Sequence, residues 1–285
     1  MKTSARPAVL ITGASTGIGE ATAHFLAARN FRVYAGVRRE EDGERLLEKS
    51  PSSDLEPVIL DVTDPDHIQR TAARLEQELG EDGLWGLFNN AGIAVAGPTE
   101  YIAVDQLRQQ FEVNVIGLIA VTQSLLPLLR KAGGRIVNMS SISGRIPAAF
   151  MGPYSASKHA VEAFSDALTS ELAPWGIRVS VLEPGAVQTP IWSKYDHDAE
   201  SLQASLPSQG QRDYGEAIAQ SRQWAAELDA RGATPETVAK AVHHALSAKR
   251  PRSRYPIGKG VGTAILMKRL LPGRLFGWVL QRIGP

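Results

Sequence analysis

Two residues with complementary acid–base chemistry, Tyr154 and Lys158, stand four positions apart in the stretch "YSASK". On a helix this spacing places both side chains on one face. A phenol has a pKa of about 10 and is a poor proton donor or acceptor at neutral pH. A neighbouring ammonium group favours the phenolate, so the pair predicts a tyrosine whose pKa is lowered toward the range of a general acid or base. Taken alone, the spacing is more often that of a surface pair.

The glycine-rich stretch "VLITGASTGIGEA", residues 9–21, fits two kinds of site. Its central part matches G-x-S-x-G, the turn that presents a nucleophilic serine in hydrolases. Gly13, Gly17 and Gly19 also form a turn that can hold a dinucleotide pyrophosphate at a helix N-terminus. The hydrolase turn needs an earlier strand and loop, yet only twelve residues precede Gly13. The position favours the dinucleotide site, with backbone N–H groups of Ser15 and Thr16 facing phosphate.

The elements that must position these residues alternate between short apolar runs and longer amphipathic segments. The runs are rich in Val, Ile and Leu and end in Gly, Asn, Asp or Ser, which predicts buried strands at 8–12, 32–37, 57–62, 86–92, 135–141 and 178–185. Helical patterns occupy 19–30, 65–80 and 158–176, with Asn30, Gly80 and Gly176 at their ends. This alternation predicts an α/β fold with a parallel sheet and helices on both faces.

Two further segments depart from this alternation. The polar stretch from about 190 to 232 has no regular pattern and is expected to be a long surface insertion that carries specificity. In the extension at about 261–285, apolar residues return at helical spacing and are interrupted by Pro272 and Gly273. The apolar residues are Ile265, Leu266, Leu270, Leu271, Leu275, Phe276, Val279 and Leu280. We expect two short amphipathic helices there.

Composition excludes several classes of function. The 285 residues carry a formal net charge of +1 and no cysteine, which gives no case for nucleic-acid binding, disulfides or a thiolate metal site. The six histidines show no metal-ligand spacing, so no metal is expected. We find no secretory signal pattern, and the longest apolar stretch, about 117–129, is interrupted by polar residues and Pro127. These features predict a soluble, cytoplasmic protein.

Several motifs together resemble the short-chain dehydrogenases/reductases. "TGASTGIG", "NNAG" (89–92), "YSASK" (154–158) and "PG" (184–185) occur in the order and spacing of that family, over roughly residues 7–260. Within that family, the chain resembles the hydroxysteroid and retinol dehydrogenase-like members. The resemblance implies one Rossmann-type domain over residues 1–285, with a doubly wound seven-stranded parallel sheet and NAD(P) lying across the carboxyl ends of its strands.

The resemblance also implies roles for individual residues. Tyr154 would donate the proton, Ser141 would orient the substrate oxygen and Lys158 would hold the nicotinamide ribose. Asn114 would bend its helix and hold a water that leads to the lysine. Ser140 is the alternative to Ser141, although the spacing favours Ser141. The cofactor-binding residues would be Gly13, Ser15, Thr16, Gly17, Ile18, Gly19, Arg38, Asp61, Val62, Asn90, Ala91, Gly92, Tyr154, Lys158, Pro184, Gly185, Val187 and Thr189.

The choice between NAD and NADP depends on the residues after the second strand. Relatives that prefer NAD usually carry a carboxylate there, where this sequence has Val37 followed by Arg38 and Arg39. A guanidinium group offers a planar fork to the oxygens of a 2′-phosphate. The neutral Thr16 weakens this inference, since relatives that prefer NADP often have a second basic residue in the glycine loop. We expect NADP(H) to be preferred over NAD(H).

The predicted function is therefore an NADP-dependent oxidoreductase that interconverts a ketone or aldehyde and an alcohol, on an apolar steroid-, retinoid- or lipid-like substrate. One alternative is a 3-oxoacyl-thioester reductase, although such relatives tend to end sooner after the seventh strand, "YPIG". Another is a non-catalytic dinucleotide-binding redox sensor, which would predict loss of Tyr154 or Lys158, and both are present.

Partners can be expected from two surfaces. The stretches 106–131 and 154–172 are unusually apolar, and in the family the corresponding helices often form a four-helix interface, so a homodimer or homotetramer is expected. No acidic residue follows Glu236, while basic residues continue to Arg282. The C-terminal segment either packs back on the domain or forms a flap over the substrate cleft that rests on an anionic membrane surface.

Overall fold

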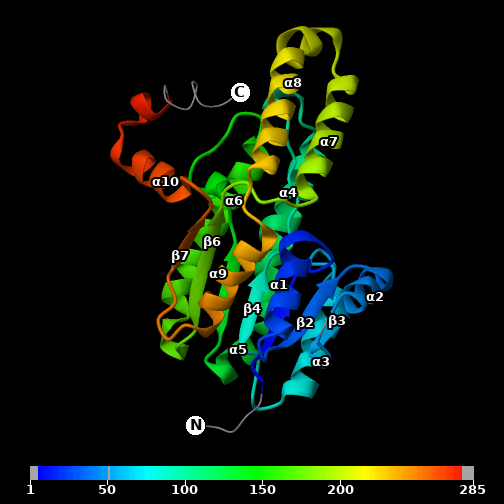
Figure 1. The fold of residues 1–285 in the computed structure, drawn as a ribbon, viewed down its shortest axis with the longest axis vertical. Coiled ribbons are helices and arrows are strands. Elements are labelled where there is room, and N and C mark those ends of the chain that lie inside the picture. The colour runs from blue at the N-terminus through cyan, green and yellow to red at the C-terminus, as the bar shows by residue number, and fades with distance from the viewer. Residues whose placement is uncertain (1–5, 51, 278–285) are drawn as a thin grey trace.

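Seven parallel strands form one sheet in the order β3-β2-β1-β4-β5-β6-β7, as the computed structural model shows (Figure 1). The structure describes residues 6–50 and 52–277. The strand order reverses at β1, which pairs with β2 on one side and with β4 on the other. This is the doubly wound Rossmann-type arrangement that the sequence predicted. The strands are β1 (Ala8–Ile11), β2 (Arg32–Val37), β3 (Leu55–Ile59), β4 (Gly86–Asn89), β5 (Arg135–Met139), β6 (Arg178–Pro184) and β7 (Arg254–Ile257).

Helices cover both faces of the sheet because successive strand residues point to opposite sides. Val9 and Ile11 pack with the inner faces of α1 and α9, which lie side by side in Figure 1. Leu10 and Tyr34 belong to the opposite core, together with apolar residues of α3 and α5. The helices are α1 (Gly17–Ala27), α2 (Glu40–Glu48), α3 (Pro65–Leu79), α4 (Val104–Phe111), α5 (Leu118–Ala132), α6 (Gly152–Glu171), α7 (Ile191–Ser205), α8 (Ser208–Ala230), α9 (Pro235–Ser247) and α10 (Val261–Leu270).

The insertion at about 190–232 corrects one expectation from the sequence. It is not an irregular loop but a helical hairpin of α7 and α8, which extends beyond the sheet (Figure 1). Its apolar seam is thin, with Ala199, Leu206, Ile218 and Ala225 buried between the two helices and their surroundings. Such a narrow stripe within a polar sequence does not produce a clear helical periodicity.

The longest helical stretch also differs from expectation. Helix α4 continues through a π-helical turn, Glu112–Gly117, into α5. The resulting helix, Val104–Ala132, has the length and composition that could cross a membrane, contrary to the reading of the sequence. Half of its most apolar window is buried inside the protein, and the helix packs on α3 and α6. We therefore describe it as a core helix of the fold.

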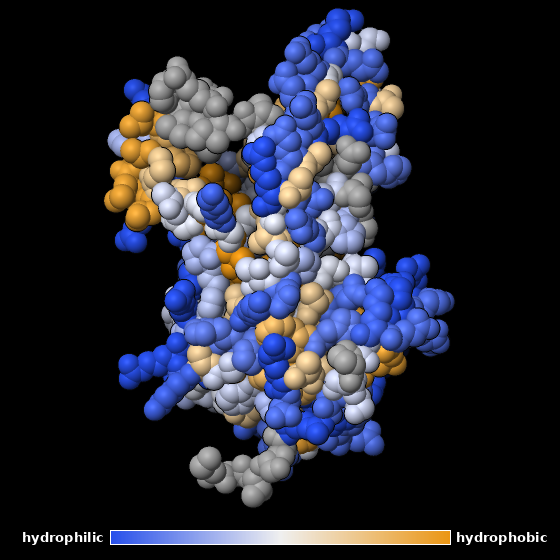
Figure 2. Space-filling view, viewed as in Figure 1, coloured by the Kyte–Doolittle hydropathy of each residue, from blue (hydrophilic) through white to orange (hydrophobic). Residues whose placement is uncertain are grey.

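The C-terminal segment begins with α10 and breaks at Pro272, after which residues 273–277 are helical again. This agrees with the two short helices predicted, although residues 278–285, with Val279, Leu280 and Arg282, lie outside the described residues. Lys268 donates a hydrogen bond to the carbonyl oxygen of Arg145, so α10 contacts the loop that follows β5. The outer side of this segment is apolar, as Figure 2 shows, with Leu266, Met267 and Leu270 exposed on α10 and Leu275 exposed after the break.

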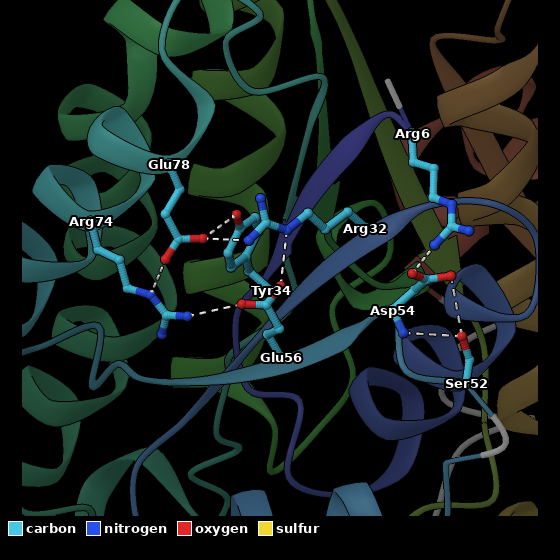
Figure 3. Close-up of polar contacts among 8 residues, drawn as sticks. All are labelled: Arg6, Arg32, Tyr34, Ser52, Asp54, Glu56, Arg74 and Glu78. Atoms are coloured by element: carbon cyan, nitrogen blue, oxygen red, sulfur yellow. Dashed lines mark hydrogen bonds and ion pairs between the residues drawn. The ribbon is translucent and has the colours of Figure 1, made fainter. Parts of the chain in front are cut away.

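A network of charged side chains lies at the amino-terminal end of β2 (Figure 3). The hydroxyl of the fully buried Tyr34 donates to Glu78 at 2.8 Å, and Arg74 donates to the same carboxylate at 2.7 Å. Arg32 links this network to Glu56, because its Nε donates a hydrogen bond of 2.9 Å to the Glu56 carboxylate. The hydrogen bond from Arg74 is the main cause that lowers the pKa of Glu78. This network stabilises the fold away from the candidate site.

Candidate active site

The loops that leave β1, β4, β5 and β6 meet at one edge of the sheet, because parallel strands share their carboxyl ends. The glycine-rich turn after β1 forms the first of them. Gly13 and Gly17 have φ values of +64° and +61°, which side chains rarely adopt, and a Cβ on Gly13 would lie 2.8 Å from the Cα of Ala91. Helix α1 starts at Gly17, so its free N–H groups face the turn, as a pyrophosphate site requires.

The remaining residues of the turn have different surroundings. Thr16 is exposed at the N-cap of α1, the Ser15 carbonyl accepts a 3.4 Å bond from Arg45, and Ile18 packs against the core. Gly19 is buried, and a Cβ there would lie 2.2 Å from the Gly13 carbonyl oxygen. Only a glycine allows the helix to approach the turn so closely.

The segment after β4 is hydrogen-bonded to this turn. Asn90 donates from Nδ2 to the carbonyl oxygens of Thr12 and Gly13 at 3.0 and 2.9 Å. The Thr12 hydroxyl in turn accepts from the backbone N–H groups of Asn90 and Ala91, both at 3.0 Å. Sequence reasoning gave Thr12 no role, although a polar residue at the end of an otherwise apolar strand was a signal for one.

Tyr154 and Lys158 lie on helix α6, one turn apart, as the spacing predicted. The ammonium nitrogen of Lys158 is 5.7 Å from the centroid of the Tyr154 ring and donates to the Met139 carbonyl oxygen at 2.8 Å. Only 4% of Lys158 is exposed, whereas Tyr154 is half-buried. Gly92 lies beside the Lys158 ammonium group, since a Cβ on this glycine would be 3.7 Å from Lys158 Nζ.

Ser141 joins this pair from the end of β5. Its hydroxyl donates to the carbonyl oxygen of Pro184 at 3.4 Å and lies within reach of the Tyr154 side chain. Ser140, the alternative, is buried on the other side of the strand, where a Cβ on Gly144 would lie 2.5 Å from its hydroxyl oxygen. The structure thus brings Ser141, not Ser140, to the tyrosine.

The pKa values of the pair correct the expectation from spacing. Burial raises the pKa of Tyr154, and the Ser141 side chain opposes this effect. The predicted lowering of the tyrosine pKa is therefore wrong for the protein alone, because the cost of desolvating a phenolate raises this pKa and the Ser141 side chain offsets it only in part. Burial also lowers the pKa of Lys158 to about 8, while Glu162 acts in the opposite direction.

Asn114 lies in the π-helical turn, buried, and faces the same site. The side-chain amide of Asn114 hydrogen-bonds to both backbone groups of Ile93. Its oxygen accepts from the Ile93 N–H at 2.8 Å, and its nitrogen donates to the Ile93 carbonyl oxygen at 3.0 Å. It also donates to the Ser157 hydroxyl at 3.2 Å. The π-turn is the distortion of the helix that the family resemblance implied, and such turns are frequent at functional sites. Ser157 was not foreseen from the sequence.

Arg38 lies beside a pocket of about 330 Å³ that is also lined by Asp61, Thr63, Arg108 and Glu112. The neighbouring Arg39 is paired with Asp42, at 3.2 Å from Nε. Within residues 6–50 and 52–277, Arg38 itself makes no hydrogen bond or ion pair, which leaves its guanidinium group available. Asp61 accepts from the Thr63 backbone at 2.9 Å, and Val62 is buried against Gly117.

The loop after β6 closes the site opposite the glycine turn. Gly185 follows Pro184 and donates to the Ile257 carbonyl oxygen at 2.9 Å. Val187 is buried, and Thr189 lies so close to the glycine turn that a Cβ on Gly17 would be 3.2 Å from its methyl group. Most of the residues predicted from the sequence therefore lie at one edge of the sheet, whereas Ser140 and Ile18 face the interior.

A sheet that reverses its order where a glycine-rich turn meets a helix N-terminus defines the class of dinucleotide-binding proteins with a Rossmann-type fold. The chain belongs to the short-chain dehydrogenase family, whose model, described as short chain dehydrogenase, matches residues 7–200. It is thus an oxidoreductase of that family.

Individual relatives are similar over nearly the whole chain. Retinol dehydrogenase 5 of Mus musculus is 38% identical over 288 residues, which cover 97% of this chain and 88% of that protein. The 17-beta-hydroxysteroid dehydrogenase type 6 of Bos taurus is 39% identical over 286 residues, with the same coverage of 97% and 88%. An actinorhodin polyketide ketoreductase solved with NADPH is 29% identical, with a TM-score of 0.76 over 92% of this chain and 99% of that one.

Proposed function

We propose that this protein is an NADP(H)-dependent oxidoreductase that interconverts a ketone or aldehyde and the corresponding alcohol. The observation that carries the proposal is the convergence of Ser141, Tyr154 and the buried Lys158 beside the glycine-rich turn. Residues 1–285 would form one dinucleotide-binding domain, to which the α7–α8 hairpin and the C-terminal segment are additions.

In this proposal the glycine turn, Asn90 to Gly92 and Pro184 to Thr189 hold the dinucleotide, which when bound supplies or accepts the hydride. Ser141 donates a hydrogen bond that orients the substrate oxygen. Tyr154 delivers a proton from its hydroxyl to that oxygen in the reductive direction. Lys158, held by the Met139 carbonyl, places a positive charge behind the tyrosine, and Asn114 fixes the backbone at Ile93 beside it.

The experiment replaces Tyr154 with Phe, which removes the titratable oxygen and keeps the ring. Turnover of NADPH with an apolar ketone should fall by about 10²–10⁴-fold while NADPH binding stays nearly unchanged. Activity within a factor of a few of wild type would rule out Tyr154 as the proton donor. A protein that binds NADPH but turns over no carbonyl in either form would instead favour the redox-sensor alternative.

The preference for NADP(H) is proposed from Arg38. Its guanidinium group is exposed at the cofactor edge and unpaired among the described residues, whereas Arg39 is held by Asp42. Val37 stands where a carboxylate would select the ribose hydroxyls of NAD. The NADPH in the ketoreductase structure supports the same cofactor class here.

An apolar substrate is proposed from the relatives named for retinol and hydroxysteroids, which are more similar to this chain than the polyketide ketoreductase is. The exposed apolar side of α10 bears Leu270, which is 71% exposed, beside Lys268 and Arg269. We propose that this surface makes peripheral contact with an anionic membrane in which such substrates partition, the rest of the protein lying in the cytoplasm. A 3-oxoacyl-thioester reductase is the second candidate.

A homodimer or homotetramer is proposed from the outer sides of α4, α5 and α6. Val104, Leu107 and Ile116 are exposed along the long helix, and Phe164 is exposed on α6. Large apolar side chains exposed on neighbouring helices are typical of a surface that a second copy covers.

A further inference from the structure

One arginine of helix α2 contacts the glycine-rich turn and has no role in the function proposed above. Arg45, in the last turn of α2, donates from Nη2 to the carbonyl oxygen of Ser15 at 3.4 Å and to the carboxylate of Asp42 at 2.6 Å. Within residues 6–50 and 52–277, it is the only charged side chain that hydrogen-bonds to the backbone of residues 13–19. A positive charge from α2 therefore lies at the turn where phosphate is expected.

The contact with Ser15 also brings Arg45 near the segment that carries Arg38. Strands β1 and β2 are paired, and the backbone N–H of Ala14 donates to the Gly36 carbonyl oxygen at 2.8 Å. Ser15 directly follows Ala14, and Arg38 stands two positions after Gly36. Because both segments leave neighbouring parallel strands at the same edge of the sheet, Arg38 and Arg45 approach one region of that edge from two elements.

The Arg45 guanidinium group is held in place and still has free donors. Its anchor, Asp42, is buried and also accepts from Arg39 Nε at 3.2 Å. Both bonds of Arg45 use Nη2, so its Nε and Nη1 form no hydrogen bond or ion pair in the described part of the chain. The side chain is 43% exposed. A guanidinium group fixed at one end and open at the other can bind an anion with little further loss of side-chain freedom.

The charge of a 2′-phosphate requires more than Arg38. A phosphate monoester carries a charge of about −1.5 to −2 at pH 7, whereas Arg38 supplies one positive charge. The glycine-rich turn adds none, because residues 13–19 contain no basic side chain. Asp42 compensates one of the two arginines that it binds, so Arg39, Arg45 and Asp42 together leave one more positive charge. Of these two arginines, only Arg45 contacts the turn.

We propose that Arg45 is a specificity-determining residue of the cofactor site, which binds the 2′-phosphate of NADP(H) together with Arg38. Asp42 holds its guanidinium group against the glycine-rich turn. This role rests on the proposed function, through its preference for NADP(H). A structural brace between α2 and the turn would support NADH and NADPH alike, whereas a residue that binds the 2′-phosphate supports NADPH alone.

The test compares cofactor affinities in the full-length protein without substrate. Arg45→Met removes the charge and keeps the apolar part of the side chain. In titrations that follow the fluorescence of the bound cofactor, the Kd for NADPH should rise by roughly five- to twentyfold and the Kd for NADH by less than about twofold. Calorimetric titrations with adenosine 2′,5′-bisphosphate and with 5′-AMP should show the same difference, because these two probes differ only in the 2′-phosphate.

The matched control is Lys49→Met. Lys49 lies at the end of α2 and pairs with Glu20 of α1 at 2.8 Å, so this variant also removes one positive charge and one contact between α2 and α1. Both affinities should stay unchanged in this control. Arg45→Lys keeps the charge but not the planar fork, and should reduce the preference for NADPH by about twofold or more.

Equal losses of NADPH and NADH affinity in Arg45→Met, or an unchanged ratio of the two, would overturn this role of Arg45. If Arg45→Met does not fold, an unchanged ratio in Arg45→Lys has the same consequence. A wild-type protein that binds NADPH no more tightly than NADH would instead overturn the proposed cofactor preference itself. Because these titrations need no turnover, their outcome is independent of whether Tyr154→Phe confirms the proposed reaction.

Discussion

Replacing Lys158 with Met should make the protein more stable while abolishing its proposed activity. Lys158 is 4% exposed, and burial lowers its pKa from 10.5 to about 8. A buried ammonium group is thus held in its charged form at neutral pH against the preference of its surroundings. Methionine has a similar length and no charge, so it fills the same space without that penalty.

The size of the effect follows from the pKa. Each tenfold change in proton affinity is worth about 1.4 kcal/mol, so lowering the pKa from 10.5 to about 8 corresponds to roughly 3 kcal/mol at pH 7. The substitution also removes the hydrogen bond to the Met139 carbonyl, which costs about 1 kcal/mol or more. We therefore expect Lys158→Met to raise the free energy of unfolding by about 1–2 kcal/mol at pH 7.

The lowered pKa of Lys158 also predicts how the stability difference changes with pH. Between pH 8 and 10.5 the unfolded chain binds more protons at this lysine than the folded protein does, so the wild type gains stability as pH rises. Urea unfolding at pH 7 and 9.5 should show the advantage of the variant shrinking by about 2 kcal/mol. Lys240→Met, on the exposed surface of α9, is the control and should show no such change. A Lys158→Met protein that is less stable at pH 7, or whose difference from wild type ignores pH, would refute the reasoning.

Four further predictions follow from the structure. Arg38→Ala should weaken NADPH binding by at least about tenfold and NADH binding little, whereas Arg39→Ala should affect both slightly; equal losses for the two cofactors in fluorescence titrations would remove Arg38 from 2′-phosphate recognition. Glu78→Gln should cost about 1 kcal/mol in urea unfolding at pH 7, and the difference should disappear as pH falls below 4.5 through the lowered pKa of Glu78. Truncation after Gly262 should raise KM for large apolar carbonyls much more than for small ketones and reduce salt-sensitive co-sedimentation with anionic liposomes; unchanged ratios and no liposome binding by the full chain would leave α10 a structural element. Light scattering at micromolar concentration should give at least twice the mass of 30.7 kDa, and a monomer would contradict the proposed interface on α4, α5 and α6.

The sheet was predictable because each strand is short, apolar and closed by a polar or glycine residue. The run 32–37 matches β2 at both ends, and the remaining predicted runs overlap their strands within a few residues. Parallel pairing then brings the ends of these strands to one edge, which is why motifs far apart in sequence could be assigned to one site. Asn30, Gly80 and Gly176 all have positive φ values. Only Gly80 ends the helix predicted for it, since α1 stops at Ala27 and α6 stops at Glu171, before a separate 3₁₀ turn that leads to Gly176.

What could not be predicted depends on contacts between distant segments. The α7–α8 hairpin is held by a few small buried residues, too few to mark a helical face in a polar sequence. The difference between Arg38 and Arg39 arises only from Asp42, which captures one of two adjacent arginines. In the sequence, Glu162 is one polar residue of an amphipathic helix. Its buried position next to Arg254 of β7, which also contacts Glu183 of β6, is determined only by the fold.

The raised pKa of Tyr154 could not be predicted from local spacing either, because it results from burial in the folded protein. This raised pKa suits one direction of the proposed reaction. Reduction needs a tyrosine that holds its proton at neutral pH, as a phenol with a pKa of about 10 already does, and desolvation of the phenolate acts in the same direction. Oxidation needs the opposite form and must work against the same desolvation. In the proposed mechanism, a charged Lys158 behind the tyrosine reduces this barrier, so its charge state would govern how reversible the site is.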